Sequence, residues 1–133
     1  MSKLDQAITF AVMAHVGQKD KHGLPAIFHP LSVMIKCDTE EEMVVAVLHD
    51  VLEDTDWIVT DLDFYLDLSQ EQIDALISLT RRAEEKYEDY IQRVKRNKLA
   101  TKVKLKDLEH NLSRPKISDS LIERYIKAIV ELQ

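Results

Sequence analysis

The chain has 133 residues, a formal net charge of −6 and 45% hydrophobic residues. This length suits one domain with a buried core, and we expect a single domain over residues 1–133. No apolar run approaches the roughly 18 residues needed to cross a bilayer, and the N-terminus lacks the layout of a secretory signal, so no membrane role is expected. The single cysteine, Cys37, excludes an internal disulfide and makes the reducing cytoplasm the expected location.

The charge is distributed unevenly along the sequence. Residues 1–80 carry 4 basic and 15 acidic side chains, whereas residues 81–133 carry 14 basic and 9 acidic ones. The acidic first part argues against a surface for extended nucleic acid. The basic second part offers cations to a small phosphorylated ligand.

Helical periodicity recurs along the chain and no strand-like alternation persists, so we predict an all-α fold, a compact helical bundle. A first helix is expected over about residues 4–17, followed by a polar loop over 18–28. Pro30 suits the first turn of a second helix, because proline lacks the N–H that a first turn leaves unpaired. This helix is expected to end near Cys37, a small core residue.

The pattern of residues 39–42 resembles a capping box, in which a threonine precedes a glutamate by three positions. It predicts the start of a third helix, which we expect to continue to about Glu53. A second capping pattern begins at Ser69. The remaining helices are expected over about 70–79, 87–96, 100–111 and 118–130.

Residues 48–55 place metal-binding and acid–base groups on an apolar helix. His49, Asp50, Glu53 and Asp54 follow directly after the apolar run 43–47. On a helix, His49 and Glu53 lie one turn apart, and successive residues diverge by about 100°. Burying such groups without partners costs several kcal/mol. We therefore infer a divalent cation that takes ligands from His49 and Asp50 and leaves two carboxylates for proton transfer.

Two ligands are too few for tight binding, so further ligands must come from other segments. His29 opens the second helix, and Asp107 lies among apolar positions that indicate burial, with Asn111 on the same helix face. Two imidazoles and two carboxylates suit Mn²⁺, Fe²⁺ or Zn²⁺ and leave positions open for water. The structural alternative is that Asp50 pairs with a lysine and that His29 caps a helix.

Four ordered segments resemble the motifs of one enzyme family. They are residues 14–18, 29–33, 48–55 and 104–112. They are similar to the HD-domain metal-dependent phosphohydrolases and, among these, to the hydrolase domain of the alarmone (ppGpp) synthetase/hydrolases and to small stand-alone alarmone hydrolases. The resemblance implies an HD-type helical bundle. It also implies an enzyme that hydrolytically removes the 3′-pyrophosphate from guanosine tetra- or pentaphosphate.

The resemblance also implies roles for individual residues. The implied ligands of one Mn²⁺ are His29, His49, Asp50 and Asp107. The carboxylates implied to activate and orient water are Glu53 and Asp54, and the residues implied to contact the nucleotide are Lys21 and Asn111. The expected partner is a small nucleotide substrate. For His110 we expect a supporting or surface role.

Two positions in the loop before the second helix depart from the family pattern. This chain has Asp20 where the family has an arginine that helps hold the base, and Ala26 where the family has a tyrosine. An anion in place of a cation repels phosphate and weakens stacking on a base. Two alternatives therefore stay open. One is a hydrolase of another nucleotide or phosphoester, and the other is a module that binds a nucleotide without turnover.

Overall fold

The computed structural model describes all 133 residues, and its regular secondary structure is helical. The helices are α1 (Lys3–Ala14), α2 (Phe28–Lys36), α3 (Glu40–Leu48), α4 (Val51–Asp54), α5 (Val59–Leu66), α6 (Gln70–Leu79), α7 (Tyr87–Lys95), α8 (Lys98–Ser113) and α9 (Asp119–Leu132). A single β-bridge joins Lys19 and Pro25 within the α1–α2 loop. The prediction of an all-α fold is confirmed.

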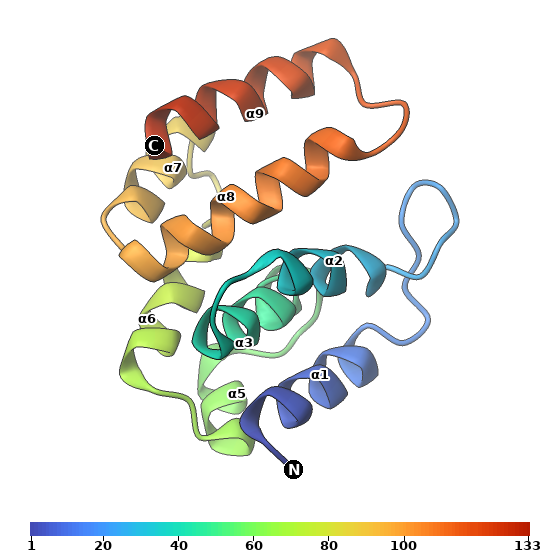
Figure 1. Cartoon of the computed structure of the whole chain (residues 1–133), viewed down its shortest axis with the longest axis vertical. Helices are drawn as coiled ribbons and strands as arrows, with labels where there is room; N and C mark the ends of the chain where they lie inside the picture. The colour runs from blue at the N-terminus through green and yellow to red at the C-terminus, as the bar shows by residue number, and fades with distance from the viewer.

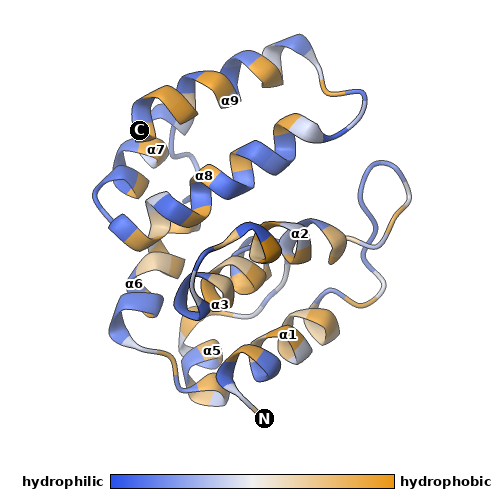
Figure 2. Cartoon of the chain, in the orientation of Figure 1, coloured by the Kyte–Doolittle hydropathy of each residue, from blue (hydrophilic) through white to orange (hydrophobic).

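Helix α3 lies at the centre of the bundle (Figure 1). It packs against α1, α2, α6 and α8, and every residue from Val44 to Leu48 is buried. Its start is acidic and its remainder apolar, as the change from blue to orange along it in Figure 2 shows. Helices α7 and α9 pack on α8, so α8 separates α9 from the N-terminal helices.

Short polar side chains begin most of the long helices. Each accepts a hydrogen bond from a backbone N–H of the first turn, which would otherwise lack a partner. These N-cap residues are Ser2, Thr39, Ser69, Asn97 and Ser118. The caps at 39 and 69 are those that the sequence patterns predict.

The prediction of an uninterrupted third helix to Glu53 is wrong. Helix α3 ends at Leu48, and α4 begins at Val51 after a break at His49 and Asp50. In a continuous helix the carbonyl oxygen of Ala46 would accept from the N–H of Asp50. Here it accepts instead from the backbone N–H of His49 at 3.4 Å and from its ring Nδ1 at 2.5 Å. The histidine ring therefore takes the place of a helical hydrogen bond.

Two further boundaries differ from expectation. Helix α1 ends at Ala14 rather than near residue 17, where Gly17 adopts a φ of +84° that ends the helical path. Helix α5 was not predicted; it buries only Leu62 and Leu66, which is too weak a periodic signal to identify it. None of the helices has the length and apolar character of a transmembrane segment.

Candidate metal centre

The four side chains predicted as metal ligands lie together, although they come from three parts of the chain. His29 is on α2, Asp107 is on α8, and His49 and Asp50 form the break between α3 and α4. The Nε2 atom of His29 lies 2.7 Å from Asp107 Oδ1 and 3.9 Å from Asp50 Oδ2. The Nε2 atom of His49 lies 3.1 Å from Asp50 Oδ1 and 3.4 Å from Asp107 Oδ1. Ligand atoms of His29, His49 and Asp50 thus all lie within 4.8 Å of one another, and Asp107 Oδ1 lies against both nitrogens.

The orientation of the His49 ring indicates what this volume accommodates. Its Nδ1 donates to the carbonyl oxygen of Ala46, which can only accept, so Nε2 of the neutral ring presents a lone pair. Nε2 is buried, has no hydrogen-bond partner and faces the carboxylates of Asp50 and Asp107. Two carboxylates opposite Nε2 favour a positive charge at this point, which either a proton on the ring or a cation bound by the lone pair supplies. The donor set fits a divalent cation.

The ionisation of these groups shows how strongly the centre favours a positive charge. Burial lowers the pKa of His49, but the carboxylates of Asp50 and Asp107 raise it to about 10. Burial raises the pKa of Asp107, but Lys104 and the two histidines hold it well below its usual range. Lys104 donates to Asp107 Oδ2 at 2.8 Å. The centre is therefore an electronegative site that retains a positive charge strongly.

His110 supports the centre from behind His29. The Nδ1 atoms of the two rings are 2.7 Å apart. When His29 presents the lone pair of Nε2 to a cation, its Nδ1 carries the proton and donates to His110. Burial and the neighbouring His29 lower the pKa of His110, which favours the neutral ring that can accept this proton. The geometry fits the supporting role expected for His110.

Replacing His110 with phenylalanine is expected to weaken metal affinity by about tenfold, because His29 loses the acceptor that fixes its ring. Competition with a coloured chelator measures this affinity. The control is His22→Phe, which removes an imidazole from an exposed loop position. An unchanged affinity of His110→Phe would contradict the supporting role.

The two carboxylates predicted to act on water lie on α4, immediately after the metal centre. Glu53 accepts a hydrogen bond from the backbone N–H of Arg81 at 2.9 Å, and the carbonyl of Asp54 accepts from the Gln18 side chain at 2.9 Å. Burial raises the pKa of Glu53 and of Asp54, and the charge of Asp50 adds to this effect. Both border an open cavity of about 700 Å³. Carboxylates with raised pKa values suit proton transfer.

Lys21 and Asn111, the residues predicted to contact a nucleotide, border a different cavity of about 70 Å³. It lies between the α1–α2 loop, the end of α8 and the start of α9. Asn111 is one helical turn beyond Asp107, so this cavity adjoins the metal centre along α8. The structure thus brings together two residues that are distant in sequence.

Asp20, which departs from the family pattern, has a local structural partner. Its carboxylate accepts from the backbone N–H groups of His22 and Leu24 at 2.8 and 3.0 Å, and from Arg114 Nη2 at 2.9 Å. Arg114 borders the same cavity as Lys21. The carboxylate at position 20 is therefore paired with a cation that borders this cavity. Sequence reasoning missed Arg114, because no local pattern links two residues 94 positions apart.

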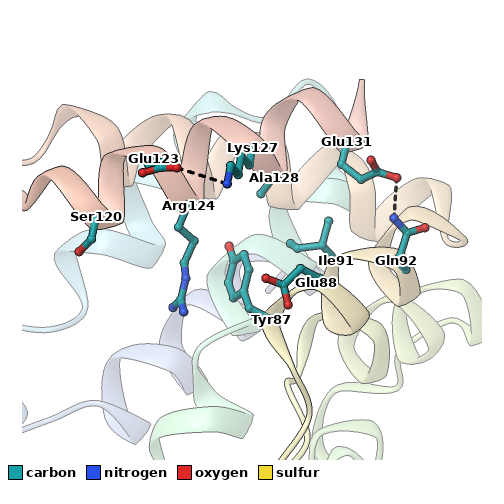
Figure 3. A pocket seen from close by; sticks show the side chains of 10 residues that line it. All are labelled: Tyr87, Glu88, Ile91, Gln92, Ser120, Glu123, Arg124, Lys127, Ala128 and Glu131. Atoms are coloured by element: carbon teal, nitrogen blue, oxygen red, sulfur yellow. Dashed lines mark hydrogen bonds and ion pairs between the residues drawn. The ribbon is translucent and has the colours of Figure 1, made fainter.

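A third cavity, of about 330 Å³, lies between α7 and α9 and contains none of the predicted site residues (Figure 3). Most of its charged groups are paired within the protein. Glu123 pairs with Lys127 at 3.3 Å, and Glu131 accepts from Gln92 at 2.5 Å. The first pair lies one turn apart on α9, and the second joins α7 to α9.

Two known proteins resemble this chain, one in sequence and one in fold. Over 58 residues, 41% of this chain, it is 43% identical to the guanosine-3′,5′-bis(diphosphate) 3′-pyrophosphohydrolase of Aquifex aeolicus (strain VF5). Its whole fold is similar to the solved structure of a metazoan ortholog of SpoT that hydrolyzes ppGpp and plays a role in starvation responses. The TM-score is 0.77 at 19% identity, over 99% of this chain and 84% of that chain. The chain has the fold of this ppGpp hydrolase.

The fold implied by the four motifs is thereby confirmed. The two comparisons cover different shares of the chains. The sequence match covers only 8% of the Aquifex protein, whereas the structural match covers 99% of this chain. No family model matches the chain. The ligand, water-activating and nucleotide-contacting roles of individual residues stay predictions.

Proposed function

We propose that this chain is a metal-dependent phosphohydrolase that removes the 3′-pyrophosphate from guanosine 3′,5′-bis(diphosphate). The observation that carries the proposal is the unpartnered Nε2 of His49, which faces Asp50 and Asp107 beside the carboxylates of Glu53 and Asp54. The motif resemblance supports this substrate. So do the two relatives, both of which are ppGpp hydrolases by name or description.

The residues proposed to hold the cation are His29, His49, Asp50 and Asp107. We propose Mn²⁺, with Fe²⁺ and Zn²⁺ as alternatives that the same donor set accepts. A divalent cation in such a site lowers the pKa of a bound water and shields phosphate charge. The protein's own part is to orient the donors, through Ala46 for His49 and through His110 for His29.

Glu53 and Asp54 are proposed to manage the protons of the reaction. One carboxylate takes a proton from the attacking water, whose oxygen forms a bond to the phosphorus next to the 3′ oxygen. The bond between that phosphorus and the 3′ oxygen breaks, and the 3′ oxygen takes up a proton. The products are pyrophosphate and guanosine 5′-diphosphate. Because the pKa values of Glu53 and Asp54 are raised, these two carboxylates exchange protons closer to neutral pH than ordinary carboxylates do.

Product analysis tests this proposal. Mn²⁺-loaded protein incubated with guanosine 3′,5′-bis(diphosphate) is expected to release one pyrophosphate for each guanosine 5′-diphosphate. Release of orthophosphate instead would show that a different bond is cleaved. Metal-replete protein without turnover of any phosphorylated substrate would favour a binding module.

A second candidate function is the hydrolysis of another nucleotide or phosphoester by the same metal centre. The observation that favours it is the altered loop, in which Asp20 is engaged by Arg114 and Ala26 supplies no aromatic surface. A nucleotide panel assayed with Mn²⁺ separates the candidates. Activity confined to simple nucleoside monophosphates would exclude the guanosine polyphosphate.

A further inference from the structure

The loop between α6 and α7, residues 80–86, forms one wall of the 700 Å³ cavity beside Glu53 and Asp54. Three cations of this loop border the cavity: Arg81, Arg82 and Lys86. None of the ion pairs of the structure involves any of them. The carboxylates that border the same cavity are Glu53, Asp54, Glu84 and Glu85. The cavity therefore combines unpaired cations with the proposed water-activating groups.

Arg93, on α7, neutralises one of these carboxylates. Its Nη2 and Nε atoms donate to the two oxygens of Glu85 at 2.9 and 3.0 Å. Its guanidinium also donates to the carbonyl oxygens of Ile77 at 3.1 Å and Thr80 at 2.8 Å. Hydrogen bonding to Arg93 lowers the pKa of Glu85 to about 2. The bidentate pair anchors the loop to both helices that flank it.

The same pair orients the two arginines. The backbone N–H of Arg82 donates to Glu85 Oε1 at 3.1 Å, and Arg81 Nε donates to the Glu85 carbonyl oxygen at 3.0 Å. The guanidinium of Arg81 lies 5.5 Å from the centre of the Tyr87 ring. Since the backbone N–H of Arg81 also binds Glu53, the loop is fixed relative to the proposed catalytic carboxylate.

We propose that Arg81 and Arg82 form a phosphate subsite, which binds one phosphate of a pyrophosphate group while the other phosphate lies at the metal centre. In this proposal, Glu85 and Arg93 are positioning residues that act through the two arginines. Guanidinium groups bind phosphate oxygens in pairs, and unpaired guanidiniums beside an open cavity are available to do so. The proposal rests on the proposed function, since the subsite serves a substrate that reaches Glu53.

Binding of methylenebisphosphonate, a pyrophosphate analogue that is not hydrolysed, tests the subsite by calorimetry in excess Mn²⁺. The double variant Arg81→Ala/Arg82→Ala is expected to bind it at least about tenfold more weakly, because charge-assisted hydrogen bonds are lost. The matched control is Lys95→Ala/Lys127→Ala, which removes the same charge at exposed positions outside the cavity. Metal content, measured separately, is expected to stay unchanged in both.

A double-mutant cycle tests the positioning role. Glu85→Gln is expected to weaken binding several-fold in the natural sequence and to cause no further loss in the Arg81→Ala/Arg82→Ala background. Arg93→Lys gives a second, independent comparison. An equal loss in both backgrounds would overturn the positioning role.

The subsite itself would be overturned by unchanged affinity in the double variant, or by no binding to the natural sequence. The bisphosphonate affinities of the double variant and of the natural sequence do not depend on which products form from a guanosine nucleotide. If the guanosine substrate fails while the bisphosphonate results hold, the subsite stands and the proposed substrate is wrong.

Discussion

Asp50→Ala is expected to abolish both stoichiometric metal binding and hydrolysis. The Asp50 carboxylate lies 3.1 Å from His49 Nε2 and 3.9 Å from His29 Nε2, so it joins the two imidazoles of the centre. Without it, two histidines and Asp107 remain, and the nearer of the two carboxylates that face His49 is lost. Metal analysis after dialysis and a hydrolysis assay measure the two effects.

Asp56→Ala is the matched control for this prediction, because it removes the same charge at an exposed position two residues beyond Asp54. The ion pairs of Asp50 are confined to the two histidines, so Asp50→Ala is expected to leave the helical content intact by circular dichroism. A folded Asp50→Ala protein that retained one equivalent of Mn²⁺ would exclude Asp50 as a ligand.

Local signals account for the parts of the fold that the sequence predicted well. Ser69 and Ser118 each start a helix because a hydroxyl next to a periodic apolar segment satisfies a first-turn N–H wherever the helix packs. The break at His49 is different, because it depends on a ring that bonds a carbonyl three residues earlier and turns toward α2 and α8. The periodicity of apolar residues does not reveal that a side chain, rather than the next backbone N–H, bonds this carbonyl.

The candidate site shows the same division between local and tertiary information. The polar run on an apolar helix identified His49 and Asp50, because buried polar groups require partners. The position of His29 at a helix start and the apolar pattern around Asp107 supplied two further candidates, and the motif resemblance implied the same set. The structure brings these two residues within 2.7 Å of each other across 78 positions. The pairs Asp20–Arg114 and Glu85–Arg93 were not predicted, since isolated charges are usually solvated and no spacing distinguishes these.

Glu53→Gln is expected to retain the metal and to lower kcat by about 100-fold or more, the usual range for a lost proton-transfer group. The glutamine amide oxygen can still accept from the backbone N–H of Arg81, so the loop that borders the cavity is expected to keep its position. What is lost is the capacity to take up a proton. Because substrate contacts persist, KM is expected to change little.

The pH profile distinguishes proton transfer from a structural effect of Glu53→Gln. Burial raises the pKa of Glu53, so the basic form, and with it activity, is lost as pH falls through a value above the usual glutamate range. Glu53→Gln is expected to remove this acid limb, whereas Glu84→Gln, an exposed change in the same cavity, is expected to keep it. If Glu53→Gln and Asp50→Ala hydrolysed substrate at equal rates, the assignment of separate ligand and proton-transfer roles would be wrong. A retained metal with a lost acid limb is the result that places Glu53 at the reacting water.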